Sequence, residues 1–107
     1  MAQIIWTEPA LSDLNQIAEY IALDSFSAAQ KLVQRVFIAV ERLADFPESG
    51  RIPQELADSQ YREIVYNPCR VFYRYDEKQN KVYIIYVMRA ERMLRRYLID
   101  ERAGLKE

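Results

Sequence analysis

The feature that most constrains this fold is a change in hydrophobic periodicity near Pro47. Before it, apolar residues recur three and four positions apart, as on one face of a helix. After it, apolar and aromatic residues come in the short alternating or continuous runs typical of strands. Two amphipathic helices must bury their apolar stripes, and a sheet offers the matching face. With 107 residues, the chain is predicted to form a single α+β domain spanning 1–107.

The first half predicts a helical hairpin. A first helix is expected over residues 8–23, with Thr7 as its N-cap. Ser27 followed by Gln30 has the form of a capping box, which predicts a second helix over residues 28–45. A proline then follows and ends the helical pattern. Because the connection between the two helices is short, they are expected to lie antiparallel.

The remaining segments predict a mostly antiparallel sheet with a helix or tail after it. Strands are expected at residues 2–6, 62–66, 70–75 and 82–89, a polar loop with at most one turn of helix at 47–60, and a last helix at 90–102. The predicted order is therefore β-α-α-β-β-β, followed by a short C-terminal helix or tail.

The rarest residue types exclude several classes of chemistry. The sequence contains no histidine, so His-based nucleophile systems, imidazole acid–base catalysis and most catalytic zinc sites are excluded. Gly50 and Gly104 are the only glycines, which rules out a Gly-rich phosphate loop. Cys69 is a lone cysteine, expected to be a small buried residue. No metal or cofactor is expected.

The same sequence features favour a cytoplasmic location. A single cysteine allows no intrachain disulfide and fits a reducing compartment. The first residues lack the basic and apolar regions of a secretion signal, and no run approaches the roughly 20 apolar residues of a membrane span. No interaction with a membrane is expected.

Charge is distributed unevenly along the chain. Residues 1–50 carry three basic and seven acidic side chains, whereas residues 51–107 carry twelve basic and nine acidic ones. Most of the positive charge is arginine, which makes bidentate contacts with carboxylates and phosphates. This local positive field on a weakly acidic protein indicates a specific anionic partner surface.

Each of two arginine-bearing segments can be interpreted as a binding surface or as a purely structural feature. If residues 90–102 are helical, Arg92, Arg95 and Arg96 share one face, which is either a binding surface or a solvated charged face. On the strand 70–75, Arg70 and Arg74 point to the same side. They could hold an acidic segment or a nucleotide, or their stems could extend along the rim of the sheet.

Five segments, in order, resemble the ParE-type toxins of the RelE/ParE toxin–antitoxin superfamily. They are IIWTEPALSDL (4–14), FPESGR (46–51), YREIV (61–65), RVFYR (70–74) and VMRAER (87–92). The resemblance runs from about residue 3 to residue 98, and it implies the RelE/ParE-like fold. It also implies a toxin that poisons DNA gyrase, acts in plasmid maintenance, and is neutralised in a hetero-oligomer by a cognate ParD-like antitoxin. Operator DNA would be contacted only indirectly, through the antitoxin.

The other branch of the superfamily, which resembles RelE, cuts mRNA on the ribosome. A fold shared by two branches does not choose between them. On the nuclease alternative, Arg70 and Tyr97 would lie near the scissile phosphate, but the strand after the helical hairpin offers no lysine. The resemblance therefore favours a binding toxin without catalytic residues. A toxin that has lost its potency is a third alternative.

The predicted contact residues fall into two groups. The target is expected to meet Arg89, Arg92, Arg95 and Arg96. The antitoxin is expected to cover the hairpin and a sheet edge, with contacts at Leu14, Ile21, Val33, Phe37, Arg70 and Arg74.

Overall fold

The computed structural model describes residues 1–57 and 59–106, without the side chains of Tyr97, Leu105 and Lys106. The elements are β1 (Gln3–Trp6), α1 (Glu8–Ala22), α2 (Phe26–Glu41), the 3₁₀ turns η1 (Arg42–Ala44) and η2 (Gln54–Leu56), β2 (Tyr61–Tyr66), β3 (Cys69–Asp76), β4 (Lys81–Arg89) and α3 (Arg96–Lys106). The predicted α+β class and element order are confirmed. In this part of the chain no helix is both long and apolar enough to cross a bilayer.

The four strands form one sheet in the order β1-β4-β3-β2. β1 is parallel to β4, and the other two neighbouring pairs are antiparallel. The pairing with β1 ends at Ile84, so β4 continues past its neighbour from Ile85 to Arg89. This free stretch of strand edge is where the candidate site lies.

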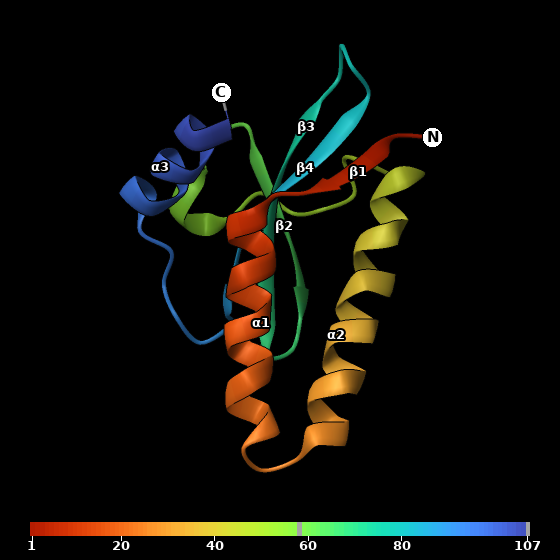
Figure 1. The fold of residues 1–107 in the computed structure, drawn as a ribbon. Coiled ribbons are helices and arrows are strands. Elements are labelled where there is room, and N and C mark those ends of the chain that lie inside the picture. Colours follow the sequence, from red (N-terminus) through yellow and green to blue (C-terminus); the bar gives the residue numbers. More distant parts are fainter. Residues whose placement is uncertain (58, 107) are drawn as a thin grey trace.

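The sheet separates two apolar clusters. The larger one lies between the sheet and the hairpin of α1 and α2, which covers one face of the sheet (Figure 1). The smaller one lies on the opposite face of the sheet. Its members outside the strands include Leu56 of η2, Leu94 of the segment before α3, and Ile99 of α3. The segment after β4 is therefore held against the face that the hairpin does not cover.

A β-bulge in β4 sets which side chains reach each face. Phe72 pairs with Tyr86 and Tyr73 pairs with Ile84, so Ile85 has no partner residue on β3. Ile85 and Tyr86 consequently both join the smaller cluster, while Val87 returns to the larger one.

The helix caps confirm one prediction and correct another. The Thr7 hydroxyl accepts a hydrogen bond from the Ala10 N–H (3.4 Å), as expected of an N-cap. The second helix begins at Phe26, earlier than predicted, and its N-cap is Ser25 instead of Ser27. The reason is that the Ser25 hydroxyl already accepts from the Ala28 N–H (3.2 Å).

The predicted helix over residues 90–102 is wrong at its start. Residues 90–95 form turns and irregular backbone, and α3 begins only at Arg96. In a helix that began at residue 90, the Leu94 N–H would donate to the Ala90 carbonyl, but it donates to the Glu55 carboxylate instead (3.0 Å). Met93 in this irregular segment is 77% exposed.

Cys69 lies fully buried at the start of β3, as expected of a small packing residue. Burial raises the pKa of its thiol to about 11, so the thiol stays protonated at neutral pH.

Gly50 is required by close packing, and we expect Gly50→Ala to destabilise the fold. Its N–H donates to the Tyr73 hydroxyl (2.9 Å), and an added Cβ would lie 2.6 Å from that oxygen and 2.8 Å from the Glu63 carbonyl. Overpacking of this kind costs about 1–3 kcal/mol, measurable as a lower midpoint in urea.

Gly104 provides the matched control for this substitution. It lies exposed in α3, and beyond its own stretch of helix no atom of the described residues comes within 4 Å of an added Cβ. Gly104→Ala should therefore be neutral or stabilise the protein by roughly 0.5–1 kcal/mol. Equal midpoints for the two variants would contradict the packing argument.

Candidate functional site: a groove lined by arginines

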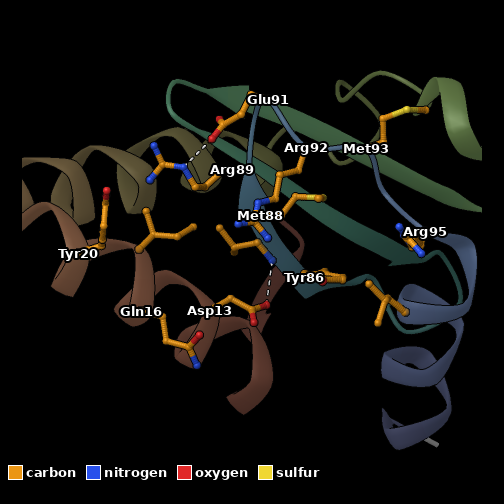
Figure 2. A pocket seen from close by; sticks show the side chains of 13 residues that line it. Asp13, Gln16, Tyr20, Tyr86, Met88, Arg89, Glu91, Arg92, Met93 and Arg95 are labelled. Carbon is orange, nitrogen blue, oxygen red and sulfur yellow. Dashed lines mark hydrogen bonds and ion pairs between the residues drawn. The ribbon is translucent and has the colours of Figure 1, made fainter.

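A groove of about 890 Å³ lies between α1 and the segment after β4. The free half of β4 forms its floor. Its lining residues are Asp13, Gln16, Ile17, Tyr20, Tyr86, Val87, Met88, Arg89, Glu91, Arg92, Met93, Arg95 and Leu98. Figure 2 shows Arg89, Arg92 and Arg95 on the sheet and loop side of the groove, across from the side chains of α1.

Arg89 is partly neutralised by its neighbours. Its Nε lies 2.7 Å from a Glu91 carboxylate oxygen, and its guanidinium lies 5.6 Å from the centre of the Tyr20 ring. The hydrogen bond between Arg89 and Glu91 raises the pKa of Arg89 and lowers the pKa of Glu91. Arg89 therefore joins the sheet to the α1 wall of the groove.

Arg92 and Arg95 are the cations that the groove leaves available. Both residues are exposed, and within the described ranges neither guanidinium has a hydrogen bond or ion pair. The lining also includes apolar side chains such as Ile17 and Met88. Two unpaired guanidiniums in a groove that also presents apolar side chains are suited to a carboxylate-bearing protein surface.

Arg96 does not line the groove. It is the first residue of α3, and its Nε lies 3.7 Å from the Asp100 carboxylate one helical turn later. Of the four arginines predicted to meet the target, the structure brings Arg89, Arg92 and Arg95 together and places Arg96 outside.

An ion pair that the sequence did not predict closes one end of the groove. Arg102 of α3 donates from both Nη atoms to the Asp13 carboxylate of α1, at 2.9 Å each. Asp13 also accepts from the Val87 N–H (3.1 Å, dashed in Figure 2), and Arg102 donates to the Ile85 carbonyl (3.1 Å). The Val87 N–H and the Ile85 carbonyl, on the edge of β4 beyond the end of β1, thereby gain hydrogen-bond partners. The pairing with Asp13 raises the pKa of Arg102.

A second unpredicted cluster surrounds Arg70 behind the groove. Its Nε donates to Glu63 (2.8 Å), and both Nη atoms donate to Glu55 (2.9 and 2.8 Å). Nη1 also donates to the Arg92 carbonyl (2.9 Å), and Nη2 donates to Glu63 (3.3 Å). All five N–H donors of the guanidinium are therefore used. The Glu63 carboxylate also pairs with Arg51, whose Nε lies 3.0 Å from Glu63 Oε2.

This cluster corrects both roles expected of Arg70. Its side chain is only 8% exposed and has no donor left for a phosphate or for an antitoxin carboxylate. The hydrogen bonds from Arg70 lower the pKa of Glu55 to about 2, and the pKa of Arg70 is raised. Arg70 is therefore a structural cation. The side chain of Tyr97, its predicted catalytic companion, lies outside the described part of the structure.

The residues predicted to meet an antitoxin differ in accessibility. Leu14 is 2% exposed and belongs to the larger core, so its predicted contact is wrong. Ile21, Val33 and Phe37 are partly buried against that core. Arg74 is partly exposed, with its guanidinium 4.8 Å from the centre of the Tyr83 ring. Sequence reasoning missed the apolar side chains that the hairpin does expose, Tyr20, Leu23, Phe26 and Ile38.

Comparisons with known proteins are consistent with this geometry. Residues 4–94 match the family model described as the ParE toxin of the type II toxin–antitoxin system parDE. The chain is 40% identical over 93 residues to Toxin RelE2 of Caulobacter vibrioides, covering 87% of this chain and all of that protein. It is 45% identical over 49 residues to the putative toxin Y4kP of Sinorhizobium fredii, covering 46% of this chain and 51% of that protein.

Solved structures share the fold. A chain from the chromosomal ParDE system of P. aeruginosa superposes with a TM-score of 0.69 at 24% identity, covering 85% of this chain and 98% of that one. A chain of the RelBE2 complex of Mycobacterium tuberculosis gives 0.56 at 19% identity, with coverages of 82% and 96%. The isolated RelE toxin of E. coli gives 0.54 at 16% identity, and both chains are covered completely.

Proposed function

Because this chain belongs to the ParE toxin family of type II toxin–antitoxin systems, we propose that it inhibits growth by binding DNA gyrase through the groove. The observation that carries the proposal is the pair of exposed guanidiniums of Arg92 and Arg95, unpaired among the described residues, in a groove that also presents apolar side chains. Such a surface binds an acidic protein segment through bidentate contacts, and arginines of this kind are frequent interface hot spots.

The chemistry of the groove supports binding over RNA cleavage. Cleavage at a 2′-hydroxyl needs a base for the proton and free cations for the phosphate. The groove offers free cations in Arg92 and Arg95, but its carboxylates, Asp13 and Glu91, are both ion-paired, and Arg70 has no free donor. We therefore propose that the toxin acts by occupying its target, without catalysis.

Charge reversal in the groove tests the proposal. With purified gyrase, this protein should inhibit supercoiling, and Arg92→Glu or Arg95→Glu should each weaken inhibition about ten-fold or more, as expected for loss of a hot-spot contact. The matched control is Arg35→Glu, because Arg35 is an exposed arginine on α2 outside the groove. No inhibition at micromolar toxin, or equal losses in all three variants, would contradict gyrase binding by the groove.

The alternative is a ribosome-dependent mRNA endoribonuclease, which the similarity to Toxin RelE2 of Caulobacter vibrioides favours. Primer extension on mRNA from expressing cells separates the two functions. We expect intact messages while growth is inhibited, and breaks at fixed codon positions would support the nuclease instead.

We further propose that a ParD-like antitoxin neutralises the toxin in a hetero-oligomer. Leu23 and Phe26 at the tip of the hairpin are 80% and 68% exposed, and Ile38 on α2 is 69% exposed. Large apolar side chains at this exposure are typical of protein interfaces. An antitoxin helix packed against the hairpin would bury them, and contact with operator DNA would then come through the antitoxin.

A further inference from the structure

The groove's two free cations lie on backbone without regular structure. Arg92 and Arg95 belong to residues 90–95, which join β4 to α3. Two charged groups fix this backbone from behind. The Arg70 guanidinium donates to the Arg92 carbonyl (2.9 Å), and the Leu94 N–H donates to the Glu55 carboxylate (3.0 Å).

Glu55 is central to this arrangement because one of its oxygens serves two segments. Its Oε2 accepts from Arg70 Nη1 (2.9 Å) and from the Leu94 N–H (3.0 Å), while Oε1 accepts from Arg70 Nη2 (2.8 Å). The carboxylate thus connects η2, β3 and the arginine segment, although η2 and Leu94 are 39 residues apart in sequence.

From this geometry we infer that Glu55 and Arg70 are positioning residues, which hold Arg92 and Arg95 at the spacing that the target requires. Neither positioning residue lines the groove. The inference rests on the proposed function only where gyrase binding is measured. Its structural part concerns the order of residues 90–95 and can be tested without any target.

Because the side chain of Leu94 is buried, the positioning of the backbone of residues 90–95 can be tested separately from the attachment of this segment to the sheet. Leu94 is 4% exposed in the smaller core, so apolar contacts would keep the segment near the sheet without Glu55. In Glu55→Gln, an NH₂ group replaces one carboxylate oxygen without changing the size of the side chain. In either orientation of the amide, its NH₂ group faces an N–H donor of Arg70, so at least one of the hydrogen bonds that Glu55 accepts is lost. The hold of Glu55 and Arg70 on the backbone of residues 92–94 would then weaken while Leu94 stays packed.

Limited trypsin digestion tests the structural part, since trypsin cleaves after arginine. In Glu55→Gln, we expect cleavage after Arg92 and Arg95 to be about ten-fold faster, because local opening of the segment becomes easier. Cleavage after Arg35 in α2 should change far less. Gly50→Ala serves as the control, because it destabilises the fold without touching the segment and should affect all three positions to a similar extent.

Inhibition of gyrase tests the functional part through coupling between two positions. Arg92→Glu should weaken inhibition about ten-fold in the wild-type background but less than three-fold in Glu55→Gln, where Arg92 is no longer held in place. If Arg92→Glu weakens inhibition by the same factor in the wild type and in Glu55→Gln, the positioning role is overturned. Unchanged trypsin cleavage after Arg92 in Glu55→Gln would also overturn it. If the wild-type protein leaves gyrase untouched while the cleavage pattern appears, the proposed function fails and the positioning of the segment remains.

Discussion

Replacing Arg70 with methionine is expected to lower the free energy of unfolding by about 3–5 kcal/mol, as is typical when one partner of a buried ion pair is removed. The change leaves the Glu63 carboxylate, which is 1% exposed, without its buried cation. It also leaves Glu55 and the Arg92 carbonyl without their donor. Urea denaturation at neutral pH measures the effect.

Arg74→Met is the matched control for this experiment. Arg74 lies four residues later on β3 and is partly exposed, and its described contact is with the Tyr83 ring at 4.8 Å. Loss of such a cation–π contact should cost less than about 1 kcal/mol. If both variants lose the same stability, the Arg70 cluster is not the structural element described above.

A double variant keeps the prediction measurable if Arg70→Met alone does not fold. Combining it with Glu63→Met replaces the buried pair by two apolar side chains. Replacement of a whole buried ion pair is often neutral, whereas removal of one partner is not. The double variant should therefore regain a measurable part of the lost stability, and a further loss would contradict the charge argument.

Acid is expected to remove the contribution of Glu55 to stability between about pH 4.5 and pH 2. Hydrogen bonding from Arg70 lowers the pKa of this carboxyl from 4.5 to about 2 in the folded protein. A depressed folded-state pKa stabilises the fold above the unfolded value, and this stabilisation is lost as pH falls through the folded value. The shift corresponds to about 3 kcal/mol at neutral pH.

The measurement compares free energies of unfolding for the wild type and Glu55→Gln from pH 7 to pH 2. The variant should be less stable at pH 7, and the difference should shrink toward pH 2, because glutamine does not titrate. Glu19→Gln is the control, since Glu19 lies exposed on α1. A difference that stays constant with pH would show that the Glu55 carboxylate has an ordinary pKa.

Periodicity predicted most of the fold because the elements it identified are amphipathic. The stripe of α1 with Leu14 and Ile17 faces the core, and the strand runs of β3 and β4 lie in the centre of the sheet. The cap at Ser25 was missed because two serines lie close together and either can cap a helix.

The site was only partly predictable because distant polar groups determine its backbone. The helical spacing of residues 90–102 is real, but the N–H of Leu94 is bound by Glu55, in a loop expected to be merely polar. One indication was available in the sequence. Glu63 and Arg70 each lie in an apolar strand segment, where a charged side chain is expected to have a partner. Glu55, which completes the cluster, gave no comparable indication.

The bond between Asp13 and Arg102 has a consequence for synthesis on the ribosome. This ion pair joins positions 89 residues apart. Likewise, β1 has no neighbouring strand until Lys81 and the residues after it have been synthesised. A chain is synthesised and leaves the ribosome N-terminal end first. The residues of the helical hairpin, with its exposed apolar side chains, therefore emerge before the arginine segment of the groove. On the proposed function, the residues that would bind an antitoxin are therefore synthesised before the residues that would bind gyrase.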